Sequence, residues 1–372
     1  MPPIRILVVD DSIVIRRVLS EALASDPAVE IVGTASDGRL ALAKIPQLSP
    51  DLITLDVEMP NMTGLETVKE IRKLRPHLPI IMFSTLTERG AATTLDALAL
   101  GASDYVTKPS NTGSLDLTML RIREELLPKI KALCRNRAAD KRTPVAPALP
   151  PKKIAIAERG RAHIEILAIG TSTGGPNALA EVIPAIPVDF PIPIVIVQHM
   201  PPLFTRMLAE RLDKDSAISV HEGEPGRKLE PGHAWIAPGD YHMVLERRAA
   251  GVHLAMNRNA PENSCRPAVD VLFRSVAATF GANTLAVVLT GMGSDGVLGS
   301  QAVREKGGRV YVQDEASSVV WGMPGQTAAA GFADNIFPLH DIATEIDRYV
   351  RASRQSSAVA KPIRSEVRPD AT

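Results

Sequence analysis

The stretch IRILVVDDSIVIRRVLSEALA, residues 4–24, decides the fold of the N-terminal half. It opens with a short apolar run, 4–9, that stops at Asp10 and Asp11. Apolar residues then recur at the spacing of one helix face, namely at Ile15, Val18, Leu19, Ala22 and Leu23. A buried strand followed directly by an amphipathic helix is the repeating unit of a parallel α/β sheet.

The same unit recurs along the first third of the chain. Further apolar runs span 29–34, 52–55, 80–83 and 105–107, at intervals of roughly 25 residues, which is enough for one strand and one crossover helix. A last helical pattern covers 115–134. Residues 1–134 are therefore predicted to form a (βα)₅ domain whose parallel sheet is covered by helices on both faces.

A change of composition separates this domain from a second one. Residues 135–163 hold four prolines and eight basic but only two acidic residues, without sustained periodicity, which predicts a partly extended linker. A new strand–helix series over 164–352 predicts a doubly wound, mainly parallel α/β domain. Within it, 217–256 shows short apolar runs and turn signals, which predict an antiparallel hairpin. Residues 353–372 are expected to form a flexible tail.

Composition excludes several classes of function. Lys+Arg and Asp+Glu both number 42 among 372 residues, so no net field attracts nucleic acid or an anionic membrane. No apolar run approaches the ~20 residues of a membrane span, so the chain is not expected to be membrane-embedded. The 2 cysteines lie far apart and fit a reducing compartment. We therefore expect a cytoplasmic protein.

Five polar residues follow strand ends of the first domain. Asp10 and Asp11 follow the first strand, Asp56 the third, Ser84 the fourth and Lys108 the fifth. The carboxyl ends of parallel strands meet at one edge of a sheet. Clustered carboxylates repel one another unless a hard cation such as Mg²⁺ lies between them. A lysine and a hydroxyl beside the cation suit the oxygens of a phosphoryl group.

Taken singly, these residues have simpler explanations: a helix cap for an aspartate, and a solvated surface position for the lysine. Their conjunction resembles the receiver domain of two-component response regulators, through the strings VVDDS (8–12), LDVEMPNMTGLE (55–66), FST (83–85) and YVTKP (105–109). The resemblance implies a flavodoxin-like fold and a histidine kinase as phosphodonor. It assigns roles to individual residues: Asp56 accepts the phosphoryl group, Asp10, Asp11 and Asp56 hold Mg²⁺, Ser84 (or its neighbour Thr85) and Lys108 contact the phosphate, and Tyr105 is the switch aromatic.

A second set of polar residues follows strand ends in the C-terminal half. The turn GTSTGGP, 170–176, has the Gly-x-Ser-x-Gly spacing of a nucleophile elbow around Ser172. Such a turn also binds phosphate or caps a helix. His199 and Asp295 follow two further strands. Taken alone, each has a simpler explanation: a polar residue without a catalytic role for the histidine, and a turn former or helix cap for the aspartate. Together they supply a nucleophile, a base and a carboxylate that orients the base.

This half resembles the catalytic domain of the CheB family of protein-glutamate methylesterases. The matching strings are IGTSTGGP (169–176), VQHMP (197–201), APGDYHM (237–243), RPAVDVLFRSVA (266–277), VVLTGMGSDG (287–296) and QDEASSVVWGMP (313–324). The resemblance implies hydrolysis of methyl esters on glutamates of chemoreceptors, with release of methanol, and deamidation of receptor glutamines, during chemotaxis adaptation. Ser172 would be the nucleophile, His199 the base and Asp295 its orienter. Met292 and Thr173 would supply the oxyanion N–H groups, and no cofactor would be needed at this site.

The resemblance also implies that the unphosphorylated receiver covers the esterase cleft. Two other classes compete with this interpretation. One is a non-enzymatic response regulator whose second domain binds a partner, with GTSTGG as a phosphate turn. The other is a DNA-binding output domain, which the lack of a helix-turn-helix segment or basic recognition helix disfavours.

Overall fold

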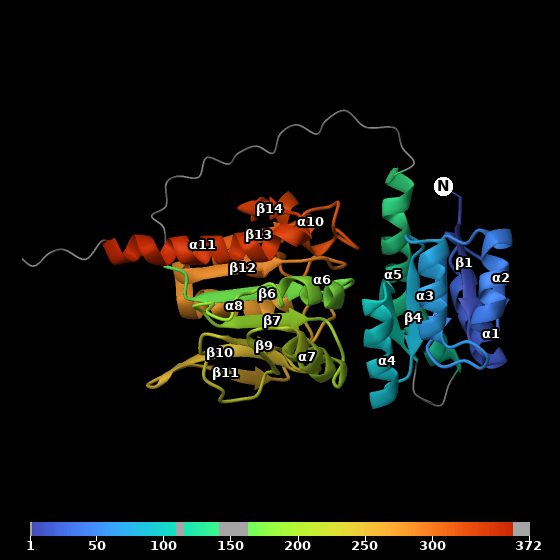
Figure 1. The fold of residues 1–372 in the computed structure, drawn as a ribbon, viewed down its shortest axis with the longest axis horizontal. Helices are drawn as coiled ribbons and strands as arrows, with labels where there is room; N and C mark the ends of the chain where they lie inside the picture. The colour runs from blue at the N-terminus through green and yellow to red at the C-terminus, as the bar shows by residue number, and fades with distance from the viewer. Residues whose placement is uncertain (1, 109–114, 141–162, 360–372) are drawn as a thin grey trace, which may run out of the picture.

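The structure is a computed structural model that describes residues 2–108, 115–140 and 163–359, and it contains two α/β domains (Figure 1). The N-terminal domain alternates strand and helix throughout: β1 (Ile4–Val9), α1 (Ile13–Ala24), β2 (Val29–Ala35), α2 (Gly38–Leu48), β3 (Leu52–Asp56), α3 (Gly64–Leu74), β4 (Ile80–Ser84), α4 (Glu88–Ala99), β5 (Asp104–Thr107) and α5 (Leu115–Asp140). The parallel sheet has the order β2-β1-β3-β4-β5. The predicted (βα)₅ domain is confirmed.

The local sequence explains why these elements form. Helix α1 begins where the Ser12 side chain accepts a hydrogen bond from the backbone N–H of Ile15, and it buries the predicted apolar face, including Val18 and Leu19. All five residues of β3 are buried, because helices cover the sheet on both sides. The carboxyl ends of β1 and β3 therefore project their aspartates at one edge of the sheet.

The C-terminal domain is built around a seven-stranded sheet of order β14-β13-β12-β6-β7-β9-β8, whose neighbouring strands within the described residues all pair parallel. Its elements are β6 (Ile166–Thr171), α6 (Gly175–Val182), β7 (Ile194–Gln198), α7 (Phe204–Asp215), β8 (Ser219–Glu222), β9 (His233–Ile236), β10 (His242–Arg248), β11 (Gly251–Asn257), α8 (Val269–Phe280), a 3₁₀ turn (Gly281–Asn283), β12 (Thr284–Val288), α9 (Val297–Glu305), β13 (Arg309–Gln313), α10 (Met323–Ala329), β14 (Asn335–Phe337) and α11 (Leu339–Val359).

The antiparallel hairpin is shorter than predicted. Only β10 and β11 pair antiparallel, whereas β9, which falls inside the predicted hairpin region, pairs parallel with β7 and β8. Ala234, Trp235 and Ile236 are all buried, as in a strand with neighbours on both faces. Its parallel pairing with β7 and β8 places β9 in the main sheet, and its consecutive buried residues fit that position, so the prediction for this strand was wrong.

Two helices run beyond the predicted boundaries. Helix α5 continues to Asp140, past the expected linker start at residue 135. Helix α11 continues to Val359, through the start of the expected tail. Ser353 is buried there, and its hydroxyl accepts a hydrogen bond from the Ile164 backbone N–H at 3.1 Å, which fastens the helix to the start of the domain. The rest of the predicted linker and tail, 141–162 and 360–372, lies outside the described residues.

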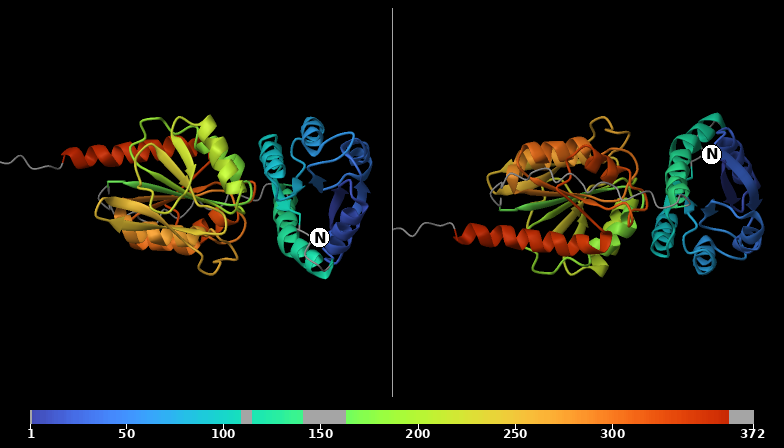
Figure 2. Two further views of the ribbon diagram at one scale, coloured as in Figure 1. Left: turned by 90° about the horizontal axis from the view of Figure 1, so that it is seen from below. Right: turned by 90° about the horizontal axis from the view of Figure 1, so that it is seen from above.

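Helices α4 and α5 of the N-terminal domain face the C-terminal domain near α6 and α7, as both views of Figure 2 show. Tyr105, on the edge strand β5 of the first sheet, stacks on Phe204 of α7. The ring centroids are 4.7 Å apart and the ring planes are 7° from parallel. Arg206 pairs with Glu88 at 2.7 Å, and Arg211 pairs with Asp96 at 3.1 Å. The contact thus combines a buried aromatic pair with a more exposed rim of charges.

Within the described residues, no helix is both long enough and apolar enough to span a bilayer.

Candidate active site

The predicted carboxylates come together at the edge of the first sheet. Carboxylate oxygens of Asp10, Asp11 and Asp56 all lie within 4.8 Å of one another. The Nζ of Lys108 is 2.9 Å from Asp10 Oδ2 and 2.8 Å from Asp56 Oδ1. Burial raises the pKa of Asp56 to about 6, although its hydrogen bond to Lys108 acts in the opposite direction. Burial lowers the pKa of Lys108, but the two carboxylates outweigh it and raise that pKa overall.

The remaining predicted residues of this domain, the two candidate hydroxyls and the switch aromatic, have other surroundings. The Ser84 hydroxyl is buried and donates to the backbone oxygen of Gly90 at 3.1 Å, so in this structure it is turned toward α4. Thr85, the alternative hydroxyl, is exposed. Tyr105 is buried in the contact between the domains, and burial raises the pKa of its phenol. The structure thus places Tyr105, the predicted switch aromatic, against the second domain.

Ser172 lies in a tight turn between β6 and α6. Gly174 adopts φ +77°, a left-handed conformation that favours glycine. A Cβ on Gly175 would lie 1.9 Å from Oε1 of Gln198, so that position has no room for a side chain. The backbone N–H of Ser172 donates to the oxygen of Thr290 at 3.1 Å. The turn is thereby fastened to the loop after β12, and the serine is only half-buried.

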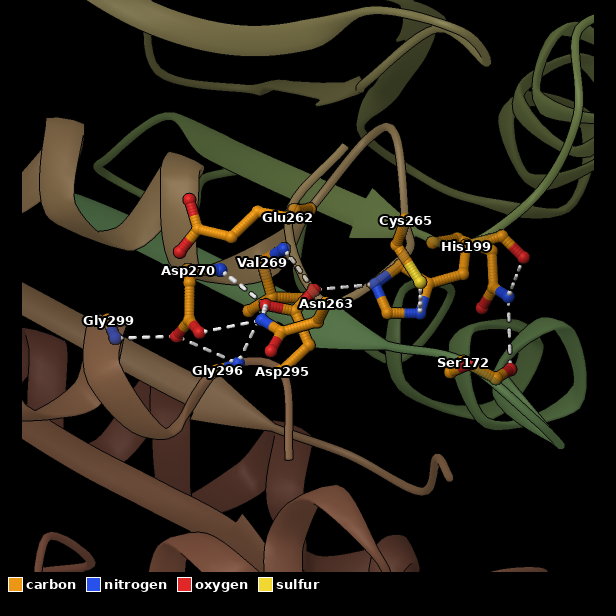
Figure 3. A network of polar contacts seen from close by, with 12 residues as sticks. Ser172, His199, Glu262, Asn263, Cys265, Val269, Asp270, Asp295, Gly296 and Gly299 are labelled. Atoms are coloured by element: carbon orange, nitrogen blue, oxygen red, sulfur yellow. Dashed lines mark hydrogen bonds and ion pairs between the residues drawn. The ribbon is translucent and has the colours of Figure 1, made fainter. Parts of the chain in front are cut away.

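His199 and Asp295 form a direct pair. Nε2 of His199 is 2.7 Å from Oδ2 of Asp295 (Figure 3). Burial disfavours the charged imidazole and is the largest single effect, but the contacts with Asp295 and Cys265 together outweigh it and raise the pKa of His199. Burial would raise the pKa of Asp295, yet His199 and the backbone N–H groups of Asp270 and Val269 together hold that pKa below its ordinary value. The pair therefore stabilises an imidazolium beside an ionised carboxylate.

Two helix N-termini hold this carboxylate in place. Asp295 accepts hydrogen bonds from the backbone N–H groups of Val269 at 2.7 Å and Asp270 at 2.9 Å, the first residues of α8. Asp270 in turn accepts from Gly299 in the first turn of α9 at 2.6 Å. Asp295 thus accepts from otherwise unpaired N–H groups at the start of α8, and Asp270 accepts from one at the start of α9. Negative charge is favoured at both helix N-termini. Burial and the nearby Asp295 raise the pKa of Asp270.

The serine and the histidine are adjacent but do not touch through a hydrogen bond among the described residues. Gln198 lies between them and donates to the backbone oxygens of both Ser172, at 3.0 Å, and His199, at 3.2 Å. The backbone N–H groups of Met292 and Thr173 have no acceptor within the described part of the chain. Each is therefore free to donate to a bound oxyanion.

Three neighbours of this site escaped prediction. Asn263 donates from Nδ2 to both Asp270 and Asp295 at 2.9 Å, and Sγ of Cys265 lies 3.5 Å from Nδ1 of His199. Asp270 falls inside the string 266–277, which offered a signal. Asn263 and Cys265 belong to an irregular turn with no local periodicity, so nothing in the sequence pointed to them.

The fold and the two sites define a response regulator whose output domain places a serine-bearing turn beside a histidine–aspartate pair. A family model described as response regulator receiver domain matches residues 6–119, and one described as CheB methylesterase matches residues 167–346. The chain belongs to the CheB methylesterase family.

Curated relatives match over nearly the full length. A protein from Trichodesmium erythraeum named protein-glutamate methylesterase/protein-glutamine glutaminase is 51% identical, over 94% of this chain and 100% of its own. A protein of the same name from Nocardioides sp. is also 51% identical, over 96% of this chain and 98% of its own. The crystal structure of the Thermotoga maritima CheB methylesterase catalytic domain is 42% identical over 50% of this chain and 98% of that chain, with a TM-score of 0.49.

Proposed function

We propose that this chain hydrolyses methyl esters of glutamate side chains on chemoreceptors, releasing methanol, and deamidates receptor glutamines by the same chemistry. The observation that carries the proposal is the 2.7 Å pair of His199 and Asp295 beside the Ser172 turn. The full-length match to relatives that carry both activities in their name supports it. Both reactions transfer an acyl group to water, so one set of residues serves both.

The geometry supports a role for each residue of the set. Because Nε2 of His199 is held by Asp295, Nδ1 is the nitrogen left to take the proton of the Ser172 hydroxyl. The serine oxygen then bonds to the ester carbon, and the resulting oxyanion accepts from the N–H groups of Met292 and Thr173. The methoxy group leaves as methanol with the proton from His199. Water, deprotonated by the same imidazole, cleaves the acyl-serine to glutamate and frees Ser172.

In the N-terminal domain, Asp56 is proposed to accept a phosphoryl group from a histidine kinase. Three clustered carboxylates, all oxygen donors, fit Mg²⁺, so Asp10, Asp11 and Asp56 would hold it. When bound, the cation would neutralise charge on the phosphoryl oxygens. Lys108, within hydrogen-bond distance of Asp56, would contact the same oxygens, and Ser84 would have to turn from Gly90 to join it. Asp56, Ser84 and Tyr105 would thus link the phosphorylation site to the domain contact.

That contact supports regulation by occlusion. The hydroxyl of Thr173, next to the nucleophile, donates to Oδ2 of Asp104 on β5 at 2.9 Å. Met292 packs against the apolar cluster of the N-terminal domain. These contacts support the proposal that the unphosphorylated receiver restricts access to the serine. Neither of the two cysteines is in a disulfide within the described residues, which fits a reducing cytoplasm, where a kinase would act on this chain.

The proposal is tested by methanol release from methylated receptor membranes. Wild-type chain is expected to release methanol, and a small-molecule phosphodonor with Mg²⁺ is expected to raise the rate by roughly tenfold, a typical coupling between sites. Asp56→Asn is expected to keep the basal rate and lose the stimulation, because the amide cannot form an acyl phosphate. Asp51→Asn, at an aspartate outside the cluster, is the matched control. Wild type that releases no methanol under either condition contradicts the proposal.

The raised pKa of His199 predicts the pH dependence. A general base acts in its neutral form, so activity is low below the pKa and rises as the pH passes through it. Because the contacts with Asp295 and Cys265 raise that pKa, we expect the rising limb of kcat/KM above the ordinary histidine value of 6.5. Asp295→Asn removes the carboxylate and is expected to move the limb to lower pH and to reduce the plateau. The measurement is kcat/KM for the phosphorylated chain against pH; a flat profile over roughly pH 5 to 9 contradicts the role of His199.

A further inference from the structure

Both ring nitrogens of His199 are in contact with side chains in this structure. Nε2 is held by Asp295 at 2.7 Å, and Nδ1 lies 3.5 Å from the sulfur of Cys265 (Figure 3). A thiol is a weak donor and a weak acceptor. It can therefore donate to a neutral ring and accept from a protonated one, so the contact persists in either state.

The turn that carries Cys265 is firmly built. The backbones of Glu262 and Cys265 exchange two hydrogen bonds, at 3.1 and 2.9 Å, across Asn263 and Ser264, which adopt φ +53° and +61°. The left-handed region is uncommon for residues other than glycine, which marks the turn as a specific conformation. Arg274 of α8 pairs with Glu262, one of its two contacts being 2.7 Å. The sulfur is thus placed by the fold.

The same turn also reaches the carboxylate. Asn263, which precedes Cys265 by two residues, donates to Oδ1 of Asp295 at 2.9 Å. Cys265 itself contacts the imidazole of His199. One short segment therefore holds both the base and its orienting carboxylate, in addition to the helix N-terminal N–H groups that bind Asp295. A change at Cys265 should move the ring and leave the carboxylate in place, because Asp295 keeps its other partners.

We propose that Cys265 is a positioning residue for catalysis: its thiol holds Nδ1 of His199 until the Ser172 hydroxyl takes that nitrogen. The proposal rests on the function proposed above, in which Nδ1 receives the serine proton. A weak partner suits this task, because an O–H···N hydrogen bond from serine displaces an S–H···N contact at little cost. Without the thiol, the ring loses one of its two anchors and spends less time aimed at the serine.

The first test compares steady-state kinetics of full-length, phosphodonor-treated chains on methylated receptor membranes. Cys265→Ala is expected to lower kcat by about fivefold with KM unchanged, because the thiol touches the base and not the bound substrate. Cys265→Ser, which keeps a donor and an acceptor, is expected to recover most of the loss. The chain has 2 cysteines, so Cys134→Ala is the matched control and is expected to keep the wild-type kcat.

The second test reads the contact itself. In ¹⁵N-histidine-labelled chain, the Nδ1 signal of His199 is expected to move in Cys265→Ala, to move less in Cys265→Ser, and to stay in place in Cys134→Ala. This readout needs no turnover, so it stands even if the proposed esterase reaction is absent. A folded Cys265→Ala chain with an unmoved signal, or with wild-type kcat while Ser172→Ala is inactive, overturns the role of Cys265 and leaves the esterase proposal standing. If the alanine variant does not fold, the serine variant decides. A folded Cys265→Ser chain whose His199 Nδ1 signal keeps its wild-type position while kcat falls would show that the loss does not act through Nδ1. That result would also overturn the role of Cys265.

Discussion

Ser172→Ala is expected to lower methanol release by about 10⁴-fold or more, since loss of the nucleophile in serine hydrolases leaves only binding and oxyanion stabilisation. Ser172 is half-buried at the end of β6, and the neighbouring imidazole lies hydrogen-bonded to Asp295. Alanine removes one oxygen and fits the same turn, because the backbone bonds of Ser172 to Thr290 and Gly175 remain. The fold should therefore survive.

The assay is methanol release from methylated receptor membranes, with thermal melting to verify folding. Ser219→Ala is the matched control, since it makes the same substitution on the edge strand β8. It is expected to keep the wild-type rate. A Ser172→Ala chain as active as wild type would remove the serine mechanism and favour the alternative of a response regulator with a partner-binding output domain.

Asp104→Ala is expected to raise the rate of the unphosphorylated chain by roughly tenfold, within the usual range of coupling between two sites. Asp104 is 5% exposed and accepts from the Thr173 hydroxyl at 2.9 Å, and Lys129 lies 2.8 Å from the same oxygen. Removing the carboxylate breaks the link to the residue beside the nucleophile. It also leaves the Lys129 charge without its ion pair at the contact, which costs free energy in the closed arrangement.

The measurement is methanol release with and without phosphodonor. The stimulated rate is expected to change little, so the ratio of stimulated to basal rate should fall. Glu30→Ala, at an acidic residue on the far edge strand β2, serves as the control and is expected to leave both rates unchanged. An unchanged basal rate in Asp104→Ala would show that this contact does not restrict the enzyme.

The fold was predictable because its signals are local. In the stretch 4–24, an apolar run and a helical repeat define strand and helix from neighbouring residues alone, and the same pattern recurs through both domains. Where the pattern failed, the cause was pairing: β9 has the length of a hairpin strand, and only its parallel partners β7 and β8 place it in the main sheet. Helix ends were missed for a similar reason, since a tertiary contact at Ser353 extends α11.

The sequence by itself determined the two α/β domains, the carboxylate cluster at Asp10, Asp11 and Asp56, and the candidate set of Ser172, His199 and Asp295. These residues follow strand ends, and parallel strands bring their carboxyl ends to one edge whatever the details of packing. Only the tertiary structure decided which groups contact them: Asp104 against Thr173 across the domains, and Cys265 against His199. Asp104 lies on the edge strand β5, and Cys265 lies in an irregular turn, and both are distant in the chain from the residues they contact. Such contacts depend on how the elements pack, which no local periodicity encodes.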